Sequence, residues 1–207
     1  MSASLYDEAL LKKLKKWIKD ESMTLTGPDE TRRLFSYTLD NQNDEPIKLP
    51  LIALRREPTI QILNLTKKPM TFDGWRKNND GNRSDQLNAI PINLMYQIDI
   101  YTRYKQEAEE YVRDFVFNLI NYPRVLIEIP YNNSKLTHTC NIRLDANVTD
   151  NSDIPERLIP GQFTRYTLSI FIDDAYLFDY RTKDTWKIIA ETEIALKDSN
   201  DDKQDNE

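Results

Sequence analysis

The chain has 207 residues, of which 39% are apolar, and its 34 acidic and 28 basic side chains give a formal net charge of −6. This length can form one domain with its own core, and no apolar run is long enough to cross a membrane. The single cysteine, Cys140, excludes an internal disulfide and a zinc site built from cysteines. Lysines interrupt the apolar residues of the N-terminal segment, which argues against a secretory signal and predicts a soluble protein of a reducing compartment.

Residues 4–19 have the pattern of an amphipathic helix, with Ser4 as its N-cap and Asp7 in its first turn. Lysines cover most of the surface outside the apolar stripe, which consists of Leu10, Leu14 and Trp17. A basic amphipathic helix binds a membrane or a partner, or docks on its own domain. Because short helices are usually stabilised by their own domain, we favour docking on the chain's own sheet over docking on a neighbouring subunit.

The chain is expected to divide into three parts. Gly27 followed by Pro28 is a turn signal, so residues 1–26 are expected to form an amphipathic helical arm ahead of a single α+β domain at residues 27–197. Residues 198–207 contain five acidic residues, one lysine and no apolar residue, which predicts a disordered acidic tail.

Short strands are expected in the first part of the domain. Residues 49–55 and 59–65 are the stronger candidates, and residues 33–39 are a weaker one followed by a polar loop at residues 40–46.

Residues 76–86 carry no apolar side chain, so burial cannot offset the cost of ordering them, and we expect a long polar loop or mobile arm. Trp75 lies at the base of this segment. Aromatic and arginine side chains are enriched in interface centres, which makes the segment a candidate contact between subunits, with a plain surface loop as the alternative. The candidate contacts to subunits or partners are Trp75, Arg76, Lys77 and Arg83, together with Leu10, Leu14 and Trp17 of the first helix.

The middle of the chain gives the clearest pattern. Residues 92–101 alternate between apolar and mostly polar side chains, as a half-buried strand does, and residues 104–119 then change to helical spacing. Pro123 ends this helix, and a strand follows at residues 125–129.

Further strands are expected at residues 136–144 and 163–173, and a last short helix or strand at residues 185–196. Together these elements predict an α+β fold: a mixed, largely antiparallel sheet flanked by an N-terminal helix and a central helix, with a long polar loop.

The sequence offers little for catalysis. Four glycines, no two of them close enough for a phosphate-binding loop, exclude the common nucleotide sites, and one histidine excludes multi-histidine metal sites. His138 and Cys140 share one face of a strand, where a nucleophile pair is conceivable, although such pairs normally face each other from different elements. Asp173 and Asp174 point to opposite faces and are expected to end a strand rather than to bind a cation. We therefore expect no enzyme, no cofactor and no metal site.

One stretch of the chain resembles a known family. The run from Ile90 to Tyr104 (IPINLMYQIDIYTRY), followed by the acidic helix that begins at Glu107 and by the strand after Pro123, resembles the tail-completion proteins of contractile-tailed bacteriophages. The strand from Arg165 to Ile172 (RYTLSIFI) adds to this likeness. These relatives are the tail terminator or sheath-stabiliser proteins of the phage neck, and the similarity covers roughly residues 50–180.

The resemblance implies a structural virion protein without catalytic residues. It implies a homo-oligomer, in this family a hexameric ring, that caps the tail tube and sheath and meets the head–tail connector. It also implies assembly in the host cytoplasm and a place in the virion at the neck. From the net negative charge of the chain, which a ring multiplies, we expect DNA to pass through the lumen without specific binding. No membrane partner is expected.

Two other interpretations stay open. The chain could be another virion subunit, from the baseplate or the head–tail joint, since such subunits are also small α+β proteins. The lysines of the first helix, with Arg76, Lys77 and Arg83, would suit a nucleic-acid-binding module, although the net negative charge argues against this.

Overall fold

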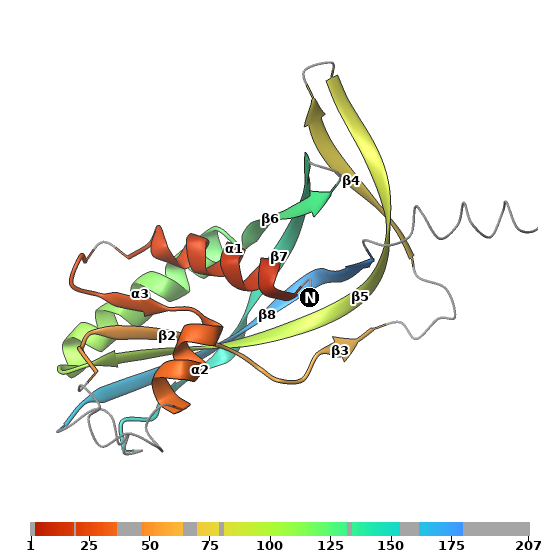
Figure 1. Ribbon diagram of the computed structural model, residues 1–207. Helices are drawn as coiled ribbons and strands as arrows, with labels where there is room; N and C mark the ends of the chain where they lie inside the picture. Colours follow the sequence, from red (N-terminus) through yellow and green to blue (C-terminus); the bar gives the residue numbers. More distant parts are fainter. Residues whose placement is uncertain are drawn as a thin grey trace, which may run out of the picture.

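The computed structural model of the protein describes residues 3–18, 20–36, 47–63, 70–78, 81–131, 134–153 and 162–179. In these residues the helices and strands are, in chain order, α1 (Ala3–Lys15), β1 (Thr24–Thr26), α2 (Pro28–Ser36), β2 (Leu51–Arg56), β3 (Gln61–Ile62), β4 (Met70–Asn78), β5 (Gly81–Thr102), α3 (Lys105–Asn121), β6 (Arg124–Tyr131), β7 (Ser134–Asp150) and β8 (Thr164–Asp179). They form an α+β fold around one curled sheet (Figure 1), which confirms the predicted class.

The sheet is organised around β5, its longest strand. The strand order is β1-β2-β5-β4-β7-β6, and β8 pairs with both β5 and β7. The β1–β2 pair is parallel, and the other pairs among the described strands are antiparallel. The predicted alternation over residues 92–101 is confirmed, because Ile92, Ile98 and Ile100 are fully buried on one face of β5.

Helices cover both faces of this sheet. Side chains that follow each other along a strand point to opposite faces. Ile98 and Ile100 accordingly join the large core beneath α1 and α3, whereas Tyr101 joins a small second core formed with α2. In that second core Leu34 and Phe35 of α2 pack toward β2 and Tyr101. The central helix and the N-terminal helix therefore flank the sheet as predicted, and α2 is an addition on the opposite face.

The first helix is part of the domain rather than an arm ahead of it. α1 ends at Lys15, so Trp17 lies beyond its last turn, and Ser4 lies inside the helix instead of capping it. Tyr6, Leu10 and Leu14 are fully buried in the large core. Figure 1 shows the red helix lying along the sheet. The predicted boundary at residue 26 therefore does not separate two packing units.

The prediction of a strand at residues 33–39 is wrong, because residues 28–36 form the helix α2. Pro28 occupies the first helical position, where its missing N–H costs nothing, and the amide of Thr31 donates to the carbonyl of Gly27 at 2.7 Å. Asp29 and Glu30 lie in the first turn, where negative charge is favourable. The expected loop at residues 40–46 lies outside the described residues.

The described residues of the polar segment, 76–78 and 81–86, lie in two paired antiparallel strands rather than in a loop. β4 and the first residues of β5 pair in register from Met70↔Ala89 to Asn78↔Gly81. Ladder hydrogen bonds join backbone groups whatever the side chains are, so a polar segment can still pair as a strand. Figure 1 shows these two paired strands, in yellow, leaving the body of the protein, and we call them the β4–β5 ribbon.

The second half of the chain follows the predicted order of elements. α3, β6, β7 and β8 confirm the helix at residues 104–119 and the strands that begin near residues 125, 136 and 163. The strand at residues 59–65 shrinks to the two residues of β3, and β8 continues past Asp173 to Asp179. The segments at residues 185–196 and 198–207 lie outside the described residues.

Candidate interaction surfaces

The β4–β5 ribbon brings together the four candidate contacts of the polar segment. Arg76 pairs directly with Arg83, and Lys77 is next to them, opposite Asn82. Trp75 pairs with Ser84 on one side and with Thr137 of β7 on the other. Three basic positions therefore lie near the end of the ribbon, and Trp75 lies where the ribbon touches the rest of the sheet.

The three candidate contacts of the first helix belong to the chain's own core. Leu10 and Leu14 have no exposed surface, so the folded chain leaves them nothing to offer a partner subunit. Trp17 is half-buried and packs edge-on against Phe115 of α3, with ring centroids 6.2 Å apart. Docking on the chain's own sheet, the alternative favoured from the sequence, is what the structure contains.

A groove of about 690 Å³ runs between α1 and β6. We call it the α1–β6 groove; its lining on the helix side is Leu5, Glu8, Ala9, Lys12, Lys13, Lys16 and Trp17, and on the strand side Tyr122, Arg124, Val125, Leu126, Glu128, Pro130 and Lys135. Five of these residues are basic and two are acidic, although the whole chain is acidic. The groove thus combines an apolar floor with a net positive rim.

The strand side of the groove is the edge of the sheet, because β6 pairs with β7 alone among the described strands. The amide of Ile142 donates to the carbonyl of Pro123, so alternate residues from 123 onward point their backbone groups at β7. The backbone groups of Arg124, Leu126 and Glu128 consequently point out of the sheet. One of them is occupied: Lys13 Nζ donates to the carbonyl of Arg124 at 2.5 Å. Partial burial lowers the pKa of Lys13, and the nearby Lys16 adds to this.

His138 and Cys140 do not form a nucleophile pair. Both contact the same carbonyl oxygen, that of Asp174, at 2.7 Å from His138 Nε2 and 3.5 Å from Cys140 Sγ. Burial raises the pKa of the Cys140 thiol to about 12, which leaves almost no thiolate at neutral pH. Burial also lowers the pKa of His138. The pair is therefore part of the packing between β7 and β8, without an activated nucleophile.

Asp173 and Asp174 lie within β8 rather than at its end. Asp174 has a φ of 60°, a left-handed conformation, next to the irregularity in β5–β8 pairing between Ile92 and Leu94. Asp173 forms an exposed ion pair with Arg143, with 3.1 Å between Asp173 Oδ2 and Arg143 Nε. No cluster of metal-ligating side chains occurs within the part of the chain that the structure describes.

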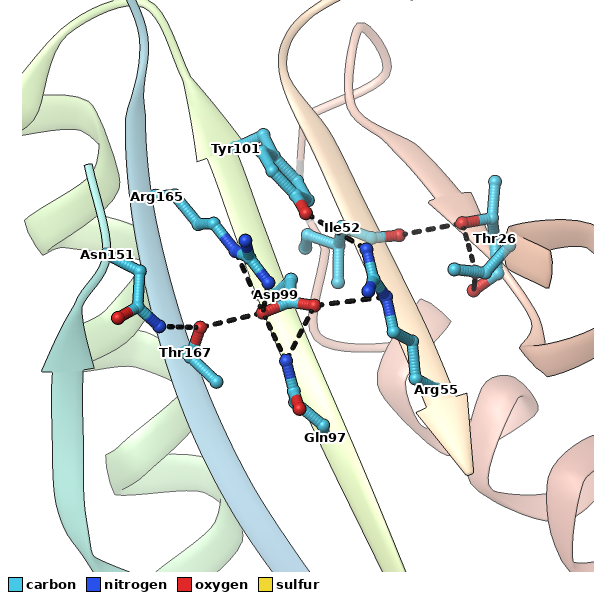
Figure 2. A network of polar contacts seen from close by, with 10 residues as sticks. Thr26, Ile52, Arg55, Gln97, Asp99, Tyr101, Asn151, Arg165 and Thr167 are labelled. Atoms are coloured by element: carbon cyan, nitrogen blue, oxygen red, sulfur yellow. Dashed lines mark hydrogen bonds and ion pairs between the residues drawn. The ribbon is translucent and has the colours of Figure 1, made fainter. Parts of the chain in front are cut away.

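A buried polar network that the sequence did not reveal lies on the α2 face of the sheet (Figure 2). Asp99 of β5, with no exposed surface, faces Arg165 Nη2 on β8 at 3.2 Å and Arg55 Nε on β2 at 3.2 Å. Thr167 and Gln97 donate to the same carboxylate at 2.7 and 2.8 Å. One carboxylate therefore connects three adjacent strands.

This network extends outward at both ends. Asn151, after β7, donates to the hydroxyl of Thr167 at 2.9 Å, and Arg55 Nη2 donates to the hydroxyl of Tyr101 at 3.2 Å. The guanidinium of Arg55 also lies 4.5 Å from the ring centre of Phe35 on α2. The only sequence signal for this polar network was Asp99 within the alternating strand. That signal does not distinguish a buried acid from a solvated one.

In the described residues, no helix combines the length and the apolar composition needed to span a membrane. Comparison of the chain with protein-family models finds no match, and comparison of its sequence with curated proteins finds none.

Proposed function

We propose that this chain is a structural subunit of a bacteriophage tail that completes the tail at the neck. In this proposal copies of the chain form a ring, hexameric as in the family that the sequence resembles, which caps the tube and sheath and joins them to the head connector. The observation that carries the proposal is the β4–β5 ribbon, a long two-stranded element that leaves the body of the subunit (Figure 1).

A two-stranded ribbon is marginally stable by itself, and the open edge of a strand is a template for pairing with another chain. In the described part of the chain, the backbone ladder between β4 and β7 consists of one residue pair, Trp75↔Thr137. Contact with a neighbouring subunit would supply strand pairing beyond what the described residues offer the ribbon. Its basic positions at Arg76, Lys77 and Arg83 suit a neighbour that, like this chain, carries a net charge of −6.

The proposal assigns no catalytic residue, cofactor or metal, and it places the protein in the virion after assembly in the host cytoplasm. DNA would pass through the lumen of the ring without specific binding, since a net negative protein repels phosphate charge. A baseplate or head–tail joining subunit would use the same ribbon. Imaging of labelled particles separates these roles, because density at the distal end of the tail would contradict the neck.

The direct test is the mass of the purified full-length protein, alone and mixed with tail tubes. We expect an assembly of six 24.4 kDa subunits, or one that forms on the tubes. A variant with Arg76→Glu, Lys77→Glu and Arg83→Glu should lose this assembly while its Tm stays within a few degrees of the parent protein, because the changes lie on the projecting ribbon.

A control variant with Arg103→Glu, Lys105→Glu and Arg113→Glu makes the same change in charge at exposed positions around α3. It should assemble as the parent protein does. A parent protein that stays monomeric at every concentration and ignores tail tubes would overturn the proposal. A salt-sensitive shift with duplex DNA, lost in the ribbon variant, would instead favour the nucleic-acid-binding interpretation.

A further inference from the structure

The α1–β6 groove has the features of a site for an added strand. Its strand side presents outward-pointing backbone groups at Leu126 and Glu128, which an extended segment can pair with, as in β-strand addition. Pro130 has no amide and marks the end of the available edge. Leu126 is 56% exposed, so apolar surface beside this edge is left uncovered in the described structure.

The helix side of the groove favours an acidic ligand, because most of its charged residues are lysines. Lys12 and Lys13 of α1 and Lys16, just after it, line the groove, and Lys135 of β7 lines its strand side. Glu8 and Glu128 offset only part of this charge, and Glu128 is already paired with Lys135 at 2.7 Å. An extended segment that fits the groove therefore needs apolar residues for the floor and acidic residues for the rim.

We propose that the α1–β6 groove binds residues 185–207 of the same chain as an added strand. In sequence, this segment begins with apolar residues that include Ile188, Ile189, Ile194 and Leu196. It then continues into the stretch at residues 198–207, which has five acidic residues and one lysine. The segment thus has both chemistries that the groove requires. This inference does not depend on the tail function proposed above.

The end of β8 lies close enough to the α1–β6 groove for the segment that follows β8 to reach it. The hydroxyl of Tyr6 on α1 accepts from the amide of Tyr176 at 2.7 Å and donates to its carbonyl at 3.0 Å, so the C-terminal part of β8 lies beside the first half of α1. Leu5, the neighbour of Tyr6, lines the groove. β8 itself runs on to Asp179, and the six residue steps from Asp179 to residue 185 span up to about 20 Å when extended.

Hydrogen–deuterium exchange of the full-length protein tests the proposal at the amides of Leu126 and Glu128. Bound by an added strand, these edge amides should exchange at least ~10-fold more slowly than the same residues in an unstructured peptide. A Lys12→Glu/Lys16→Glu variant should lose this protection. The matched control Lys15→Glu/Arg113→Glu, with exposed residues that do not line the groove, should keep it.

Charge exchange then separates binding of the segment from a structural effect on α1. Adding Asp198→Lys, Asp201→Lys and Asp202→Lys to the Lys12→Glu/Lys16→Glu variant should restore the protection. Amides that exchange freely in the parent protein, or protection that the Lys12→Glu/Lys16→Glu variant keeps, would overturn the proposal. Protection that increases with protein concentration would also overturn it, by assigning the segment to a second copy.

Discussion

Asp99 and Arg165 form an ion pair between β5 and β8 that is almost removed from water, since their side chains are 0% and 9% exposed. Arg55 of β2 approaches the other oxygen of the same carboxylate, at 3.2 Å. A single acid therefore compensates two guanidinium groups on the two strands that flank it. Such an arrangement makes the pairing of β2, β5 and β8 depend on one side chain.

Replacing Asp99 by Asn should be strongly destabilising. The change removes the buried carboxylate charge that faces Arg165 and Arg55, and breaking a buried pair from one side costs about 3–5 kcal/mol. Urea denaturation of the parent protein and the variant measures this loss. The control is Asp173→Asn, which breaks the exposed pair with Arg143 and should cost less than about 1 kcal/mol. Equal losses in the two variants would contradict the role given to Asp99.

Tyr6→Phe should loosen α1 from β8. The variant removes the hydroxyl that serves both the amide and the carbonyl of Tyr176, and an unsatisfied buried backbone group costs about 1–3 kcal/mol. Thermal and urea unfolding should both show the loss. Tyr104→Phe is the comparison, because the side chain of Tyr104 is 73% exposed, and it should unfold as the parent protein does.

The protonation of His138 should depend on folding. Burial lowers its pKa below the ordinary value of 6.5, while contact with the carbonyl of Asp174 opposes the shift. The unfolded chain therefore takes up a proton that the folded chain resists, so the free energy of unfolding should fall as pH drops below about 6.5.

His138 is the single histidine of the chain, so its imidazole signals can be followed by NMR without ambiguity. We expect a titration midpoint below 6.5 in the folded protein and near 6.5 in urea. His138→Gln should remove this part of the pH dependence of stability. A folded-state midpoint above 6.5 would show that Asp174 outweighs burial.

Cys140 should be nearly inert in the folded protein. Because burial raises the pKa of its thiol to about 12, the thiolate fraction at pH 8 is about a thousandth of that of an ordinary cysteine with a pKa near 9. A thiol reagent should label it at least a hundredfold faster in denaturing urea than in buffer. Stability should also decline above about pH 9, because the unfolded thiol ionises first. Rapid labelling of the native protein at pH 8 would contradict this placement.

Side-chain periodicity predicted the elements that have one buried face. The alternation in β5 and the helical spacing of α3 both place apolar residues against the same core, so tertiary packing agrees with the local pattern. The pattern did not predict α2, because its only large apolar residues, Leu34 and Phe35, are adjacent and cover a small second core. Pro28 followed by two acidic residues is a signal of a helix start as well as of a turn, and the prediction used only the turn.

The candidate sites were harder to predict than the fold. Residues 76–78 and 81–86 of the β4–β5 ribbon have no apolar alternation in their sequence by which periodicity could reveal a strand, and their pairing depends on backbone groups that every sequence has. The α1–β6 groove joins residues more than a hundred positions apart, such as Lys13 and Arg124, and no local pattern records that proximity. Leu10 and Leu14, by contrast, were correctly expected to pack on their own sheet as the favoured alternative.

The length of β5 has a mechanical consequence. This single strand has 22 residues, which corresponds to about 70 Å measured along the strand. Its first part forms one side of the ribbon, and residues 88–102 lie along β8. The ladder hydrogen bonds run across the strands, so a lengthwise pull at the ribbon would load many of them in shear at once. A tensile load applied there would be shared along the body of the subunit instead of peeling the strands apart one bond at a time.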